Sequence, residues 1–296
     1  MPMWYNYYGD NMNLLISWKF WVILYLFSAV IFAQTFKKAN RRMKDAGALT
    51  IILELLTGLC AILFIPFFPL TIPNDFKIYL VLFIVTIIYA ATDRLNIEAR
   101  YGLDPSTFSM LKQLSTVFLI IFGFIFLKED LVLTKIIGAL IIIFGNLILS
   151  FDKGKFKISK YFIMSIISNI LFAIAMLINV NISNNFNIAI YTIITVSIPS
   201  FFIYIFGKYN FNTLKKEYKL YNKPQLYISA FTWCLMLISS VKAYQYGSII
   251  VVAPLLALTG ILNATIEFIF NHNKNKFVQK LIAAILIIIG IIFIKI

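Results

Sequence analysis

Among the charged side chains within the long apolar stretches of this sequence, the candidates that stand away from dense charge runs are Glu54, Lys112, Lys242 and Glu267. A charge at the centre of a membrane helix costs at least about 2.5–3.5 kcal/mol on insertion scales, so each residue is a candidate for function. A buried carboxylate can hold a proton or an ammonium group, and a neighbouring lysine can neutralise it. These residue types predict reversible ion pairing, with Glu54 suited to a cationic substrate or a proton.

Glu54 and Lys112 are expected to lie at the same depth in the membrane. Each stands about two helical turns into its apolar stretch, and both stretches start from the same face because two crossings separate them. A direct ion pair between them is therefore geometrically possible, as a binding site or as a structural contact. Gln113 follows Lys112 and is grouped with it as lining a cavity.

The other polar residues in apolar stretches each have a structural and a functional interpretation. Glu267 and Lys242 lie near the ends of their stretches, where they could pair with each other or reach the headgroups. Asparagines in membrane helices more often bond across helices than bind substrate, whereas a tryptophan can form an aromatic wall for an organic cation. The remaining candidates for substrate binding or coupling are Asn169, Trp233, Tyr244, Asn263 and Glu267.

A dense run of charges, Asp93, Arg94, Glu98 and Arg100, ends one apolar stretch. Arg94 and Glu98 are four residues apart and can pair on one face of a helix. The plainest interpretation is a helix end at the level of the headgroups. The alternative is a gate formed by Asp93, Arg94 and Glu98.

The composition indicates a membrane protein. Of the 296 residues, 61% are hydrophobic and 13% charged, against roughly 45–50% and about 25% in soluble domains. The formal net charge of +14 does not indicate nucleic-acid binding, because the basic residues lie in short loops between apolar stretches, as membrane topology requires. Ten apolar stretches have about the length that a spanning helix needs: 19–36, 48–67, 76–97, 105–127, 131–150, 161–182, 188–207, 225–246, 249–270 and 277–294.

The second half of the chain repeats the first. The segment Lys135–Gly145 returns as Lys280–Gly290, and Tyr101-Gly102 returns as Tyr246-Gly247. Ten spans then divide into five per copy, and an odd number makes the second copy enter from the opposite side. We therefore expect an all-α integral membrane protein with ten transmembrane helices in two inverted five-helix repeats. The expected parts are an N-terminal tail (1–18), a first repeat (19–150), a basic linker (151–160) and a second repeat (161–296).

Three parts of the first repeat carry a family resemblance: Leu114–Phe118, Phe126–Glu129, and Ile137-Gly138 followed by Gly145. Together they resemble the end of a repeat of the EamA family, which belongs to the drug/metabolite transporter superfamily. The resemblance extends over about residues 19–296. It implies ten helices in two inverted repeats, a central cavity, and transport of small metabolites by exchange or proton coupling.

The sequence departs from the family pattern in three respects. Thr116 and Gly260 stand where the family has helix prolines, and the loop glutamate of the second repeat is replaced near His272. Nineteen lysines and arginines flank the spans on one side and six on the other, which places both termini away from the cytoplasm. Family members usually have cytoplasmic termini. The small face of Gly138 and Gly145 favours close helix packing.

The favoured hypothesis is a secondary-active transporter of a small polar or amine-bearing metabolite in the cell membrane. A lipid-carrier flippase of the same superfamily is the first alternative. A lipid-modifying membrane enzyme is less supported, because the sequence has one histidine, no metal-spaced Cys or His set and no nucleotide-binding loop. The expected partners are a small-molecule substrate and the bilayer, with a homodimer left open. No cofactor, metal or nucleic acid is expected.

Overall fold

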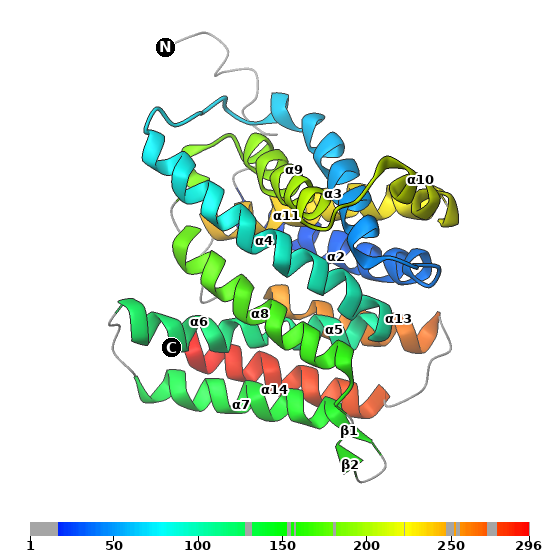
Figure 1. Ribbon diagram of the computed structural model, residues 1–296. Helices are drawn as coiled ribbons and strands as arrows, with labels where there is room; N and C mark the ends of the chain where they lie inside the picture. The colour runs from blue at the N-terminus through cyan, green and yellow to red at the C-terminus, as the bar shows by residue number, and fades with distance from the viewer. Residues whose placement is uncertain are drawn as a thin grey trace.

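The computed structural model describes residues 17–127, 132–152, 155–156, 158–179, 182–221, 223–246, 252, 255–270 and 277–295. Most of the expected tail (1–18), the loop residue Glu129, and His272 lie outside these residues. The described residues are almost entirely helical, which confirms the all-α prediction (Figure 1).

The helices follow one another along the chain with short connections. They are α2 (Trp18–Asn40), α3 (Ala46–Ile62), α4 (Phe76–Gly102), α5 (Pro105–Leu111), α6 (Leu114–Leu127), α7 (Leu133–Ser150), α8 (Lys160–Asn179), α9 (Ile188–Phe206), α10 (Phe211–Leu220), α11 (Lys223–Tyr246), α13 (Thr259–Ile269) and α14 (Phe277–Lys295). Two short 3₁₀ turns, η2 (Ile65–Phe67) and η3 (Ser183–Asn185), lie beside α3 and α9. An antiparallel hairpin of β1 (Phe151–Asp152) and β2 (Lys155–Phe156) occupies the expected linker.

Several helices have the length and composition of membrane spans. Among the described residues, α2, α4, α9, α11 and residues Phe277–Ile294 of α14 qualify, and four shorter apolar helical segments accompany them. Large apolar side chains are exposed along these helices, including Phe27 at 67% and Phe83 at 50%. Such a surface is unfavourable in water and favourable in hydrocarbon. Together with the sequence composition, it indicates an integral membrane protein.

Asn187 lies between the expected apolar stretches 161–182 and 188–207, directly before α9. Its side-chain oxygen accepts hydrogen bonds from the amides of Ala189 and Ile190, at 2.9 and 3.2 Å, and so caps α9. Its amide nitrogen donates to the carbonyls of Phe68 and Pro69, at 3.0 and 3.1 Å. A single residue, 1% exposed, therefore starts α9 and fixes the loop between α3 and α4.

Helices α7 and α14 approach each other through glycines. A Cβ on Gly138 would lie 2.4 Å from the carbonyl oxygen of Gly290, and one on Gly290 would lie 2.7 Å from that of Gly138. Gly145 faces Ala283 in the same way, at 3.1 Å from its carbonyl oxygen. This confirms the close-packing interpretation. The glycine face of α7 is therefore filled by α14 of the same chain.

The largest helix contacts are those of α2 with α11, α4 with α8, α3 with α9, and α7 with α14. Figure 1 shows α7 and α14 alongside each other at one edge of the molecule. Each pair joins a helix of the first half to one of the second half. The two halves therefore fold against each other rather than as separate bundles.

Candidate functional site

The site begins at an interruption in the fourth apolar stretch, which the sequence prediction treated as one continuous helix over 105–127. Helix α5 ends at Leu111 and α6 begins at Leu114. The amide of Ser115 donates to the carbonyl of Lys112, three residues back, at 3.2 Å. The carbonyl of Leu111 instead accepts from the side-chain amide of Asn169 on α8, at 2.8 Å. Asn169 therefore satisfies a carbonyl group at the break, which confirms its expected role as a bond between helices.

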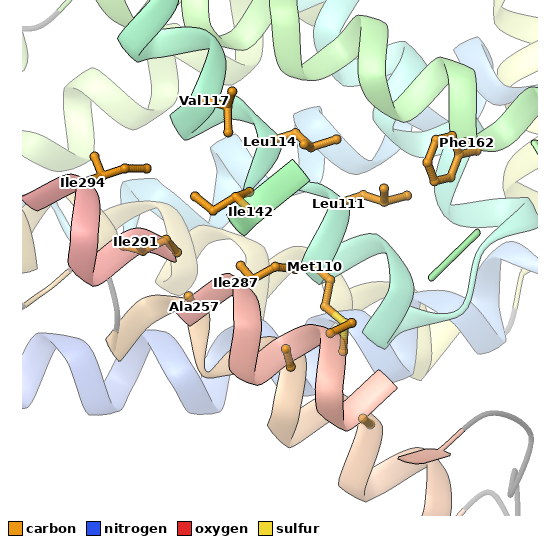
Figure 2. Close-up of a cluster of buried hydrophobic side chains, with 13 residues drawn as sticks. Met110, Leu111, Leu114, Val117, Ile142, Phe162, Ala257, Ile287, Ile291 and Ile294 are labelled. Carbon is orange, nitrogen blue, oxygen red and sulfur yellow. The ribbon is translucent and has the colours of Figure 1, made fainter. Parts of the chain in front are cut away.

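Hydrophobic packing holds the break in place. Figure 2 shows Met110 and Leu111 from the end of α5 in one buried cluster with Leu114 from the start of α6. Ile142 of α7 and Ile287 of α14 belong to the same cluster. The glycine-packed pair α7–α14 thus forms a rigid support under the interrupted helix.

The second half has a one-residue turn at the matching position, within the apolar helical segment Leu255–Ile269. Helical residues 255–257 are followed by a turn at Leu258, whose amide donates to the carbonyl of Leu255 three residues back, at 3.1 Å. Leu258 follows Gln113 by 145 positions, the spacing that separates Lys280 from Lys135. No proline or glycine marks the break at Lys112 and Gln113, so the sequence gives no local signal for it.

Glu54 does not pair with Lys112, which corrects the sequence prediction. Glu54 on α3 is 0% exposed, and neither carboxylate oxygen accepts a hydrogen bond from the part of the chain that the structure describes. Its neighbour is Asp93 of α4, which lies within electrostatic and hydrogen-bonding reach. Lys112 interacts instead with Asp93, and its Nζ lies 3.8 Å from the centre of the Phe172 ring. Asp93 therefore interacts with both Glu54 and Lys112, the two residues for which equal depth in the membrane suggested a direct ion pair.

Arg100 adds a second cation to this group. It interacts electrostatically with Asp93 and Tyr25. Its guanidinium carbon lies 3.8 Å from the ring centre of Phe108 and 4.8 Å from that of Phe32. Two carboxylates and two cations thus neutralise one another's charge between the helices. This lowers the free-energy cost of burying each of them. We call Glu54, Asp93, Arg100 and Lys112 the charged cluster.

Aromatic side chains surround the charged cluster on one side. Trp233, 7% exposed, stacks on Phe32 at 5.6 Å between ring centres, and Phe32 in turn carries Arg100 on its ring. This places Trp233 one residue away from the cluster rather than on it. Tyr244 packs in a separate hydrophobic cluster, and Gln113 is partly exposed beside the break.

The three residues of the expected gate, Asp93, Arg94 and Glu98, have different surroundings. Asp93 faces the charged cluster, whereas Arg94 is exposed. Glu98 accepts a salt bridge from Lys160 at 3.1 Å, which replaces the pairing with Arg94 that the sequence predicted. The three residues do not form one group, because position 93 lies on a different side of α4 from positions 94 and 98, and Glu98 is paired with Lys160.

Glu267 belongs to a different and fully paired network. Its carboxylate accepts from the ammonium of Lys280 at 2.7 Å, and from the amide and hydroxyl of Ser106 at 2.8 and 2.6 Å. Lys280 also contacts Asp104 at 3.0 Å. Of the two alternatives that the sequence leaves open, pairing of Glu267 with Lys242 is not the one that the structure shows. The ammonium of Lys242 lies near aromatic rings, 5.3 Å from the ring centre of Phe68. The network ties α13 and α14 to the start of α5.

Asn263 connects the two interrupted helices. It is 0% exposed, accepts from the side-chain amide of Gln34 at 2.9 Å and donates to the hydroxyl of Ser109 at 3.0 Å. Gln34 lies on α2 and Ser109 on α5. Asn263 therefore joins three helices around the breaks, and its hydrogen bonds favour a structural role over direct substrate contact.

The chain resembles known proteins over its first half. Residues 19–151 match the EamA-like transporter family. This confirms the predicted resemblance, over the first half of the chain, and is consistent with the drug/metabolite transporter superfamily. The family is one of membrane transporters.

Solved structures extend the likeness to the whole fold. One, titled "Crystal structure of protein", covers 92% of this chain and 95% of its own, with a TM-score of 0.52 and 12% sequence identity. At that identity the likeness concerns the fold alone. None of the curated proteins matches the chain.

Proposed function

We propose that the chain is a secondary-active transporter of a small polar or amine-bearing metabolite, with its site at the charged cluster between two inverted five-helix repeats. The observation that carries the proposal is a charged cluster beside an interrupted helix that has a counterpart at the matching position of the other half. Interrupted helices in corresponding positions of two repeats are a recurrent feature of transporter binding sites.

The helix contacts support the repeats. If the halves are repeats, their helices correspond by order along the chain: α2 corresponds to α8, α3 to α9, and α4 to α11. The contact of α2 with α11 then becomes the contact of α8 with α4, and both are among the largest in the molecule. The contacts of α3 with α9 and of α7 with α14 map onto themselves. A two-fold relation between inverted copies predicts this pattern.

The chemistry of the cluster supports a polar, charge-bearing substrate or a coupled proton. Glu54 has no hydrogen-bond donor in the part of the chain that the structure describes, while Asp93 is engaged by both cations. A substrate ammonium or a proton that approaches Glu54 would therefore meet an acceptor that the protein leaves unused.

Purified protein in proteoliposomes would test the proposal, with uptake of a panel of small metabolites measured with and without a proton gradient. We expect saturable uptake of at least one polar or amine-bearing compound, and a loss of roughly tenfold or more, equivalent to about 1.4 kcal/mol, in Glu54→Gln and Asp93→Asn. Arg94→Gln, next to Asp93 but exposed, is the matched control and should keep the wild-type rate.

Two results would contradict the proposal. One is the absence of saturable uptake for every compound of the panel by folded protein. The other is wild-type uptake by both Glu54→Gln and Asp93→Asn, which would move the site away from the charged cluster.

A further inference from the structure

The loops that join α2 to α3 and α9 to α11 carry a concentrated positive surface. Seven of their basic residues are exposed: Arg41, Arg42, Lys44, Lys208, Lys215, Lys216 and Lys219. We call these residues the basic surface. Helix α10 supplies three of them within ten residues.

Hydrogen bonds hold the two loops together as one surface. The amide of Lys44 donates to the carboxylate of Glu217 on α10 at 2.9 Å, and the hydroxyl of Tyr221 donates to the same oxygen. The hydroxyl of Tyr209 donates to Asp45 at 2.7 Å. Burial and the adjacent carboxylate raise the pKa of Tyr209 to about 12, so this hydroxyl stays a donor at neutral pH.

The same hydrogen bonds engage the acidic residues of the two loops, so these carboxylates have backbone amides and tyrosine hydroxyls as partners rather than the exposed lysine side chains. Asp45 and Glu217 are the only carboxylates in residues 37–47 and 207–223. Glu217 is 4% exposed, and Asp45 also caps α3 by accepting from the amide of Ala48 at 3.0 Å. The lysines of α10 thus have no exposed carboxylate beside them within these segments. Their charge is available to an external anion.

Exposed aromatic residues adjoin the basic surface. Phe206 at the end of α9 is 74% exposed and Phe211 at the start of α10 is 73% exposed. Lys208 between them adopts a left-handed backbone, with φ of 51°, which reverses the chain into α10. A short helix with lysines on one side and an apolar residue at its edge, placed directly after a spanning helix, fits the boundary between headgroups and acyl chains.

We propose that the basic surface of α10 and the α2–α3 loop binds the headgroups of anionic phospholipids in the surrounding membrane. Lysines near a membrane surface attract anionic lipid, and the flanking phenylalanines place the lysines at the height of the lipid phosphates. Acidic proteins and nucleic acids are less suited, because neither has an acyl phase to cover Phe206 and Phe211. The inference is independent of any transported substrate.

The test is lipid selectivity of the intact protein in vesicles that contain phosphatidylcholine and phosphatidylglycerol, with spin-labelled forms of each lipid as probes. Wild type should prefer the phosphatidylglycerol probe, and the preference should fall at high salt because exposed charges are screened. In Lys215→Gln with Lys216→Gln we expect the preference for phosphatidylglycerol to fall by about 25-fold, from about fivefold for each lysine.

The matched control is Lys19→Gln with Lys77→Gln, which also removes two exposed lysines but outside the basic surface. It should keep most of the preference. The proposal is overturned if wild type shows no preference for phosphatidylglycerol, or if the control loses as much as the α10 variant. Uptake in the same vesicles is a separate readout, so failure here leaves the transport proposal standing.

Discussion

Lys280→Met removes the cation that neutralises a buried carboxylate, and its effect can be worked out from the structure. Lys280 and Glu267 are 5% and 3% exposed and lie 2.7 Å apart. At an effective dielectric constant of about 20, charges at that distance attract by about 6 kcal/mol. The desolvation of both groups offsets much of that attraction. Breaking such a pair from one side costs about 3–5 kcal/mol, because it leaves an uncompensated charge.

Two features of this site place the expected loss near the lower limit. Ser106 continues to donate two hydrogen bonds to Glu267, which stabilises the carboxylate without its lysine. Asp104 is 46% exposed and water solvates it once Lys280 is gone. We therefore expect Lys280→Met to cost about 3 kcal/mol. Adding Glu267→Gln should return about 2 kcal/mol of that loss, since the amide oxygen still accepts from Ser106 and no charge remains.

Unfolding of the purified protein in detergent, followed by intrinsic fluorescence during titration with a denaturing detergent, measures these differences. The control is Lys242→Met, because that ammonium lies near aromatic rings rather than carboxylates; it should cost less than about 1 kcal/mol. Equal losses in Lys280→Met and Lys242→Met, or a double variant less stable than Lys280→Met alone, would refute the reasoning.

Two further predictions concern packing and topology. Gly138→Leu should lower the free energy of unfolding by about 3 kcal/mol or more, because even a Cβ there meets the Gly290 carbonyl at 2.4 Å. The control Leu140→Ala, at a position 59% exposed, should cost less than about 1 kcal/mol in the same unfolding assay. Comparable losses in the two variants would argue against the close contact. In a cysteine-free background, a cysteine at the exposed position Asn74 should react with a membrane-impermeant thiol reagent in intact cells, and one at the exposed position Asn210 should not; the reverse pattern would place the termini in the cytoplasm.

Much of the architecture follows from patterns that are local in sequence. The apolar stretches and their flanking charges predicted an all-helical membrane protein, and the side-chain oxygen of Asn187 starts α9 where the polar turn predicted a boundary. The similarity of Lys135–Gly145 to Lys280–Gly290 correctly drew attention to Gly138 as a close-packed position. These features are readable because hydropathy, capping and small-residue packing depend on residue type at short range.

Other features appear only when the helices are packed. Sequence spacing gave the depth of Glu54 and Lys112 but not the rotation of each helix about its axis, and that rotation brings Asp93 between them. The choice of Lys280 over Lys242 as partner of Glu267 likewise depends on α14 lying beside α13. The break at Lys112 has no proline or glycine that would predict it from the sequence. The carbonyl of Leu111 that it frees is satisfied by Asn169, which is 58 residues away in the chain. Residue type and spacing therefore determined the class and the elements, whereas the side-chain partners were decided by contacts between helices distant in the chain.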